Sequence, residues 1–504
     1  MSTTKAKTAV EHVDVLIVGA GLSGIGAACH LLSDCPGKTF ALLEAREASG
    51  GTWDLFRYPG IRSDSDMFTL GYSFRPWLEA KAIADGPSIL DYIRDTARDH
   101  GIDEQIRYHH RVVRAEWSTE ESRWTVEAER TDTGETVHLT CGFMLTCTGY
   151  FNYDEGYTPE FDGIESFGGQ IIHPQHWPAD LDYDAKRVIV IGSGATAVTL
   201  VPAMAERAAS VTMLQRSPTY IVSMPAKDPV ADLLRKTLPS KLAYSIARWK
   251  NVAIQLGFYN LAQRFPRMTR AVLRKGVAMR LPNDYEIDKH FNPRYDPWDQ
   301  RVCLVPDADL FKALRSGKAS IVTDGVEAFT ERGLKLTSGT ELEADIIITA
   351  TGLNLVALGG MSVAVDGRDV DFSECVAYKG MMFSGIPNAA VTFGYTNASW
   401  TLKADLVAQH ICRLLQHMDA NGYTQVTPHW SGSALPEDPF IDLASGYVLR
   451  SAAEFPKQGP RSPWRLHQNY ARDILLLRHR NVDDAALEFS GATSTVRKNT
   501  PIAA

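Results

Sequence analysis

Two glycine-rich stretches hold the residues best suited to bind a nucleotide. The first, within residues 14–24, has Gly19, Gly21 and Gly24, and the second, within residues 187–197, has Gly192, Gly194 and Ala197. Such a turn between a strand and a helix brings the backbone close to a pyrophosphate, and the helix N-terminus offers unpaired N–H groups. Two sites of this kind imply hydride transfer between two bound cofactors.

The residues after the second strand of each unit indicate which nucleotide binds. Glu44 follows an expected strand at 39–43, twenty residues past Gly24, and its carboxylate can accept from a ribose hydroxyl. Arg216 and Ser217 follow an expected strand at 210–214, without a carboxylate. A guanidinium there suits a 2′-phosphate, which favours NADPH over NADH. The alternative for Arg216 is a solvated surface charge.

Two further stretches fit no helix or strand period. Residues 50–64 form an irregular loop containing Trp53, Tyr58 and Asp64. Residues 167–178 lie between the two nucleotide fingerprints, and their glycines and prolines indicate a linker without regular structure. Their skeleton is Phe167, Gly169, His173 and Trp177, followed by a proline. We interpret His173 and Trp177 as linker anchors rather than as acid–base groups.

These motifs resemble those of type I Baeyer–Villiger monooxygenases, flavoproteins that depend on NADPH and FAD, over roughly residues 13–403. The chain is most similar to the mycobacterial subgroup of ethionamide-activating monooxygenases. The resemblance implies an FAD site with a backbone contact at Val112, lined also by Gly19, Gly21, Ser23, Gly24, Glu44, Thr52, Trp53, Asp54, Leu55 and Asp64. It implies an NADPH site that includes Arg62, Ser63, Gly192, Ser193, Gly194, Ala195, Thr196, Ala197, Val198, Arg216 and Ser217.

The family's catalytic arginine falls on Arg301. The resemblance implies that reduced FAD reacts with dioxygen to give a C4a-peroxyflavin, which attacks a ketone and yields an ester or lactone. Arg301, which is always cationic, would stabilise the resulting negative charge, and Asp64 would orient Arg301. Some relatives have a lysine before this arginine, but Gln300 stands here. The expected partners are dioxygen and a ketone or thioether substrate.

Two other functions stay open at this stage. The same flavin chemistry also oxygenates soft nucleophiles, so the chain can alternatively be a monooxygenase acting mainly on sulfur or nitrogen. A flavin-bound redox sensor without turnover belongs to a different class. Product analysis with a ketone and a thioether separates the first two readings, and NADPH consumption coupled to product excludes the sensor.

Composition excludes several other classes. The net charge of −8 argues against nucleic-acid binding, and no apolar run suits a secretory signal or a membrane span, so we expect a cytoplasmic protein. The seven scattered cysteines show no metal-ligand spacing, so we expect reduced thiols and no metal. Residues 233–283 contain eleven Lys or Arg and no Asp or Glu. They indicate helices with either a solvated outer face or a surface for peripheral contact with an anionic membrane.

Positioning these residues requires an α/β fold with two Rossmann-like dinucleotide-binding domains and a helical insertion. We expect an FAD-binding domain at 1–150 plus 385–504, a linker at 151–182, an NADPH-binding domain at 183–222 plus 300–384, and the insertion at 223–299. Strands are expected at 13–18, 39–43, 106–117, 124–129 and 187–191. An amphipathic helix is expected at 86–100.

Overall fold

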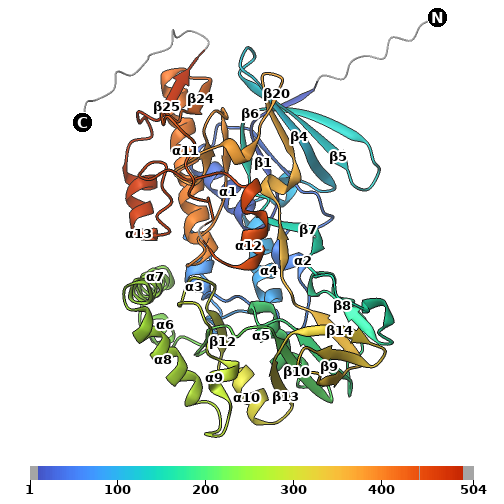
Figure 1. Ribbon diagram of the computed structural model, residues 1–504. Coiled ribbons are helices and arrows are strands. Elements are labelled where there is room, and N and C mark those ends of the chain that lie inside the picture. Colours follow the sequence, from blue (N-terminus) through green and yellow to red (C-terminus); the bar gives the residue numbers. More distant parts are fainter. Residues whose placement is uncertain (1–9, 442, 492–504) are drawn as a thin grey trace, which may run out of the picture.

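The computed structural model describes residues 10–441 and 443–491. It contains two α/β units, one above the other in Figure 1, with a group of helices beside the lower unit. The upper unit holds the N-terminal strands together with the long helix α11 (Trp400–Asn421), and the lower unit holds the middle of the chain. This arrangement confirms the expected fold class.

The upper unit is built on a nine-stranded sheet. Strands β1, β2, β3, β6 and β23 pair in parallel, whereas β4 and β5 join β6 as an antiparallel extension. Side chains of β1 alternate between the two faces, so Val15 and Ile17 enter one core and Leu16 and Val18 the other. The strands are β1 (Glu11–Val18), β2 (Phe40–Leu43), β3 (Ile106–Arg107), β4 (His110–Ser118), β5 (Arg123–Arg130), β6 (Thr136–Thr146), β19 (Ser362–Val365), β20 (Arg368–Asp369) and β23 (Ala389–Val391).

The lower unit is a five-stranded parallel sheet. Its order is β13 (Ala319–Thr323), β10 (Ser210–Gln215), β9 (Arg187–Ile191), β17 (Ile346–Thr349) and β8 (Gln170–Ile172). Residues of β9 alternate between two cores, one of which is covered by α5 (Ala195–Met204) and α10 (Asp309–Arg315). Short ladders complete the structure: β11 (Ile221–Met224) with β12 (Cys303–Pro306), β14 (Val326–Thr330) with β15 (Gly333–Leu336) and β16 (Glu341–Glu343), β7 (Phe151–Gly156) with β18 (Leu353–Leu355), β21 (Ala377–Tyr378) with β22 (Met382–Phe383), and β24 (Gln425–Pro428) with β25 (Leu487–Ser490).

The amphipathic helix expected at 86–100 is present as α4. α4 (Gly86–Asp99) begins where the Asp85 side chain accepts a hydrogen bond from the Ser88 N–H (3.0 Å), and it buries Ile89 and Ile93 on one face. The other helices are α1 (Leu22–Asp34), α2 (Thr52–Leu55), α3 (Met67–Leu70), α6 (Pro229–Thr237), α7 (Ser240–Arg264), α8 (Pro266–Ala278), α9 (Ile287–His290), α12 (Gly446–Ser451) and α13 (Tyr470–Asp473).

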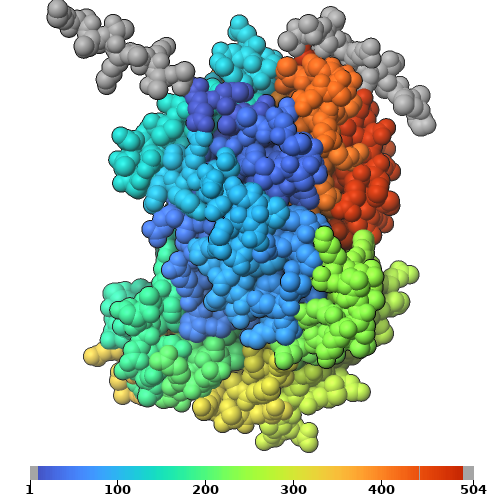
Figure 2. Space-filling view, turned by 180° about the vertical axis from the view of Figure 1, so that it is seen from behind, coloured from blue at the N-terminus to red at the C-terminus, as the bar shows by residue number. Residues whose placement is uncertain are grey.

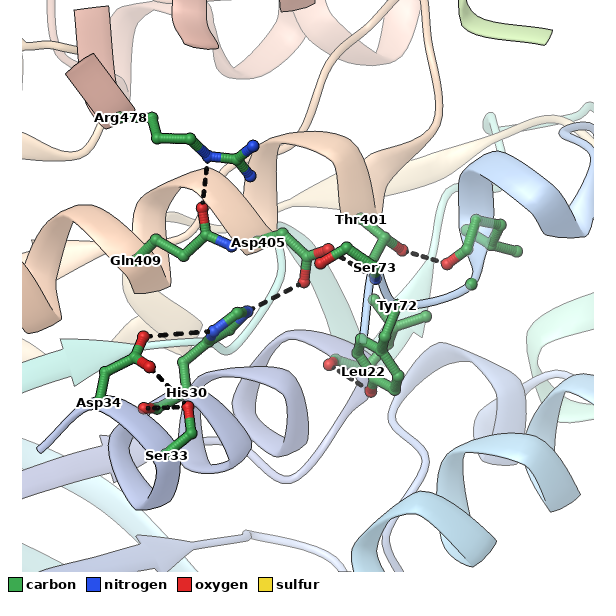
Figure 3. A network of polar contacts seen from close by, with 12 residues as sticks. Leu22, His30, Ser33, Asp34, Tyr72, Ser73, Thr401, Asp405, Gln409 and Arg478 are labelled. Atoms are coloured by element: carbon green, nitrogen blue, oxygen red, sulfur yellow. Dashed lines mark hydrogen bonds and ion pairs between the residues drawn. The ribbon is translucent and has the colours of Figure 1, made fainter. Parts of the chain in front are cut away.

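A buried polar network joins the upper unit to the helical group. Asp405 of α11 accepts from the Ser73 N–H (2.9 Å) and pairs with His30 of α1 (3.3 Å), as Figure 3 shows. Arg248 of α7 reaches the same carboxylate (3.5 Å). Burial alone would raise the pKa of Asp405, but the His30 hydrogen bond and the Arg248 charge hold it below its usual value. The network therefore anchors α7 to α1 and α11.

Two segments differ from the expected organisation. The linker was expected to have no regular structure, but it contains strand β8, which pairs with β17. This pairing needs Gly169, because a Cβ at that position would lie 2.3 Å from the Asp345 carbonyl oxygen. Strand β19 joins the upper sheet beside β4 and β20 pairs with β19 at the edge, so the chain returns to the first unit before residue 385. The remaining domain boundaries stay a proposal.

No helix among the described residues is long and apolar enough to cross a membrane. The seven cysteines are free and buried. Within 10–441 and 443–491, no cluster of three or more His, Cys, Asp or Glu side chains could hold a metal ion.

Candidate functional site

A cavity of about 1050 Å³ lies where the two units meet. It collects residues that are far apart in the sequence, from the first glycine turn, the start of α5, the irregular loop and the segment before β12. The expected site residues on its wall are Gly19, Gly21, Ser23, Glu44, Thr52, Trp53, Leu55, Arg62, Ser63, Asp64, Val112, Ala195, Thr196 and Arg301. Its size and shared lining make it the candidate site for two cofactors and a substrate.

The first glycine turn is shaped to receive a pyrophosphate. Gly19 has a φ of +103°, and a Cβ there would lie 2.7 Å from the Cys147 carbonyl oxygen. Gly24 lies behind the turn, where a Cβ would meet the Gly19 carbonyl at 1.9 Å. α1 begins after Gly21 without a side-chain cap, which leaves its N-terminal N–H groups for a ligand. These close approaches fit a dinucleotide at this end of α1.

Glu44 is fixed beside this turn. Its carboxylate accepts from the Ala20 N–H (2.8 Å) and the Arg46 N–H (3.0 Å). Burial raises its pKa, and the two backbone donors act against that shift. Each oxygen keeps a further lone pair, so the side chain can also accept from a ribose hydroxyl.

One residue of the irregular loop that was expected at the FAD instead contacts three arginines. Asp54 does not line the cavity; its buried carboxylate binds Arg46 (2.6 Å), Arg94 (2.8 Å) and Arg57 (3.1 Å) behind the loop. A buried carboxylate needs such partners, and here three cations supply them. Asp54 therefore holds the loop in place, whereas Thr52, Trp53 and Leu55 face the cavity.

Arg301 and Asp64 form an ion pair on the cavity wall. Arg301 Nη2 lies 2.5 Å from Asp64 Oδ2, and the two side chains are 40% and 30% exposed. The charge of Asp64 is the main cause that raises the pKa of Arg301. Arg301 thus places a cation on the cavity wall between the two units, and its guanidinium keeps its proton.

Two tyrosines lie near Arg301, Tyr150 on the cavity wall and Tyr447 outside it, and sequence reasoning missed both. Burial raises the pKa of Tyr150 and of Tyr447, while the nearby Arg301 charge opposes each shift. Tyr150 stacks on Trp400 (5.4 Å between centroids), whose indole N–H donates to Ser23 Oγ (2.7 Å). Tyr150 comes directly after Gly149, the glycine that follows β6, and this position could have marked it as a site residue. Tyr447 lies in a region without a motif.

The loop before Arg301 is tied to the C-terminal region. The Ala444 N–H donates to the Asp299 carbonyl (3.0 Å), two residues from Arg301. Trp298 has a φ of +79° in the same loop. The segment leading to α12 therefore helps to position Arg301, a role that no sequence spacing indicates.

The second glycine turn has the same geometry as the first. Gly192 has a φ of +137°, and a Cβ there would lie 2.3 Å from the Ala350 carbonyl oxygen. α5 begins after Gly194 without a side-chain cap. Ser193 Oγ donates to the Ser217 carbonyl (3.1 Å), which joins the turn to the end of β10. Within the described residues, the parts of this fingerprint that lie outside the cavity are Gly192, Ser193, Gly194, Ala197, Val198, Arg216 and Ser217.

Two arginines near this turn are available to an anion. Arg216 is exposed and has no ion-pair or hydrogen-bond partner among residues 10–441 and 443–491. Arg62 pairs with Asp309 through Nη1, whereas its buried Nη2 has no partner in the described part of the chain. Because a buried donor without a partner is costly, this nitrogen fits the polar group of a bound ligand.

The skeleton residues of the linker lie between the two units. Phe167 is buried in the lower core, and Trp177 packs against that unit. His173 Nε2 donates to the Gly352 carbonyl (3.1 Å), and Nδ1 accepts from the Gln175 N–H (3.2 Å). Burial lowers the pKa of His173. Neither His173 nor the other three residues (Phe167, Gly169, Trp177) line the cavity, which supports the anchoring interpretation.

Comparisons with known proteins agree with this geometry. The family described as flavin-binding monooxygenase-like matches residues 81–252, and an NAD(P)-binding Rossmann-like domain matches residues 17–79. The chain is 58% identical over 481 residues to the FAD-containing monooxygenase EthA of Mycobacterium tuberculosis, covering 95% of this chain and 98% of that protein. It is 49% identical over 492 residues to the probable FAD-binding monooxygenase AlmA of Acinetobacter baylyi, covering 97% and 98%.

A solved structure shows the same fold. An oxidised steroid monooxygenase bound to NADP superposes with a TM-score of 0.77 over 95% of this chain and 100% of that one. The two sequences are 23% identical.

Proposed function

The chain belongs to the FAD-containing monooxygenases, and from this premise we propose that it carries out Baeyer–Villiger oxidation. As an oxidoreductase of this family it uses FAD and NADP. In the proposed reaction, a ketone, dioxygen, NADPH and a proton give an ester or lactone, water and NADP⁺. One oxygen atom enters the substrate next to the carbonyl carbon, and the other leaves as water.

The observation that carries the proposal is the Arg301–Asp64 ion pair in a cavity lined by the first glycine turn and by the start of α5. Attack on a ketone carbonyl places negative charge on oxygen in the transition state. A guanidinium fixed beside that oxygen stabilises the charge by about a few kcal/mol in a site with little water. Asp64 keeps the guanidinium in one orientation, so little reorganisation is needed when the charge develops.

The chain's residues fit the two cofactors in different ways. The FAD would be held by the first glycine turn, by Glu44 at its ribose and by the wall formed from Thr52, Trp53, Leu55 and Val112. FAD, once reduced by NADPH, supplies the oxygen-activating chemistry. The NADPH would be held at the start of α5 by Ala195 and Thr196, with Arg62 and Ser63 on the facing loop.

The selectivity for NADPH is proposed to rest on Arg216. Its guanidinium is exposed at the end of β10 and free of partners among the described residues, where a 2′-phosphate of the nucleotide would lie. Because Gln300 stands where some relatives have a lysine, Arg216 would carry more of this contact. The remaining residues of the turn would contribute backbone N–H groups.

The aromatic wall limits access of water to the reacting atoms. Tyr150, Trp400 and Tyr395 line the cavity, and the ring of Tyr150 also lies 5.0 Å from that of Phe393. Excluding water strengthens the interaction of Arg301 with charge inside the cavity. The same wall offers apolar surface to the substrate, for which we propose linear or aryl ketones, with thioethers as further substrates.

Product analysis of the FAD-loaded enzyme with NADPH tests the proposal. Mass spectrometry should find an ester from a linear or aryl ketone. Arg301→Ala should keep FAD bound and lose ester formation, because the fixed cation is gone. Arg207→Ala is the matched control, since Arg207 forms an exposed ion pair with Asp184 at the same distance of 2.5 Å. Ketone oxidation at the wild-type rate in Arg301→Ala would show that Arg301 does not serve this reaction.

A further inference from the structure

The helical insertion exposes an unusual amount of apolar surface. Of the 19 exposed large hydrophobic side chains among the described residues, 12 lie between Met224 and Met279. Single exposed hydrophobic side chains are common, whereas a cluster in one segment indicates an interaction site. The insertion lies at the lower left of Figure 1 and at the lower right of Figure 2, where it forms an outer flank of the molecule.

Helix α7 is apolar on two opposite faces. Its inner face, with Tyr244 and Val252, is buried against the protein body. Its outer face presents Leu242 (49% exposed), Ile246 (40%) and Trp249 (50%) at spacings of four and three residues, which place them on one side of the helix. A helix that is apolar on both sides normally has both sides covered.

Helix α8 exposes an apolar face of its own. Met268 (48% exposed), Val272 (61%) and Met279 (69%) share one face of the helix, and Lys275 lies on the same face between them. The opposite face buries Leu273 and Val277. We call the six exposed apolar side chains of α7 and α8, together with the lysines and arginines around them, the insertion face.

The sequence segment that carries most of this face has charges of one sign only. Residues 233–283 contain eleven basic and no acidic residues. Some of these cations are neutralised by acids outside the segment, such as Lys250 by Asp228, Arg270 by Asp296 and Arg274 by Asp288. Five of the eleven cations are exposed and form no ion pair with any described residue: Lys236, Lys241, Arg264, Arg267 and Lys275.

We propose that the insertion face docks the protein on an anionic lipid surface. Interfacial helices bury an apolar face at the headgroup boundary while lysines and arginines contact anionic lipids. The long stem of Lys275 can lie along apolar surface with its ammonium group at the phosphates. A second copy of the chain fits less well, because a two-fold contact would place the unpaired cations of both copies together. This inference does not depend on the reaction that the enzyme catalyses.

The part of the insertion face on α7 lies opposite a side of this helix that contacts the loop after Asp64. On its inner side, Asn251 Nδ2 donates to Asp66 Oδ1 (2.8 Å) and Gln255 Nε2 to Asp66 Oδ2 (2.9 Å). Asp66 is two residues from Asp64, the partner of Arg301. Docking through this face would place the enzyme at the layer in which apolar ketones and thioethers dissolve.

Co-sedimentation of the FAD-loaded protein with vesicles tests this proposal. We expect binding to vesicles that contain phosphatidylglycerol, weak binding to pure phosphatidylcholine, and loss of the difference at high salt. Each cation near such a surface strengthens binding about fivefold, and Glu in its place is repelled. The triple variant Arg264→Glu, Arg267→Glu and Lys275→Glu should therefore bind at least about a hundredfold more weakly. The variant Leu242→Ser, Ile246→Ser and Val272→Ser should also bind weakly, through lost apolar contact.

The matched control is Lys312→Glu, Arg315→Glu and Lys318→Glu, three exposed cations near α10 that also form no ion pair within the described residues. It changes the net charge equally and should bind vesicles like the unaltered protein. Turnover of a water-soluble ketone should be unchanged in all three variants, which shows that they are folded. Equal binding to both lipids, or equal losses in the charge variant and its control, would overturn the proposal. So would vesicle-independent self-association that the insertion-face variants abolish.

Discussion

The exchange Asp64→Asn separates the orientation of Arg301 from its charge. Arg301 stays protonated in this variant, because a guanidinium keeps its proton with or without the neighbouring carboxylate. Asparagine has nearly the same shape and can still accept one hydrogen bond. The exchange therefore removes mainly the electrostatic attraction that holds the guanidinium beside the cavity.

The size of the effect follows from the geometry of the pair. Two unit charges about 4 Å apart attract by roughly 4 kcal/mol at an effective dielectric constant of about 20 and by roughly 1 kcal/mol in water. Because Arg301 is 40% and Asp64 30% exposed, solvent screens much of this attraction. We expect a loss of about 1–2 kcal/mol in transition-state stabilisation, which corresponds to a roughly 5- to 30-fold lower kcat for ester formation.

Steady-state kinetics with a ketone, together with FAD content and Tm, provide the assay. The KM for NADPH should change little, and FAD should stay bound. Asp184→Asn is the matched control, because Asp184 and Arg207 form an ion pair of equal length (2.5 Å) on the surface, and this exchange should leave kcat unchanged. An unchanged kcat in Asp64→Asn, or a raised KM for NADPH at constant kcat, would refute the orienting role.

Two further outcomes are expected. Arg216→Ala should raise the KM for NADPH and leave that for NADH nearly unchanged, because only NADPH has the 2′-phosphate; equal effects in steady-state flavin reduction would contradict this assignment. His410 is fully buried in α11, and burial, with the charge of Lys379, lowers its pKa to about 3. Neutral His410 therefore stabilises the fold fully at pH values above about 6.5, the pKa of a histidine in the unfolded chain. This contribution is lost as the pH falls toward 3, and the free energy of unfolding should decrease by about 2 kcal/mol between pH 7.5 and 5. His410→Gln should flatten this part of the pH dependence measured by urea unfolding, and an unchanged slope would contradict it.

The sequence is informative where a local backbone shape is needed. Gly19 and Gly192 adopt positive φ beside a neighbouring carbonyl, so their spacing predicts both turns and the helices that follow. Arg301 and Asp64 could be paired through the family resemblance, and their contact is present.

Contacts between distant segments were not predictable in this way. Asp54 is surrounded by three arginines that only the fold brings together. Tyr447 reaches the Arg301 pocket from a region without a motif, because the Ala444 N–H is bonded to the Asp299 carbonyl. Strand β19 adds to the upper sheet beside β4, more than 200 residues earlier in the chain. Contacts of this kind depend on how distant segments pack in the folded chain, and neither motif spacing nor hydrophobic periodicity predicts them.

Oxygen incorporation into the product tests the central claim most directly. The FAD-loaded enzyme is given NADPH, a linear or aryl ketone and ¹⁸O₂, and the product is analysed by mass spectrometry. Baeyer–Villiger oxidation predicts an ester with one ¹⁸O atom per molecule, formed with one NADPH consumed. NADPH consumption that yields only hydrogen peroxide, or that oxygenates a thioether but no ketone, would contradict the account.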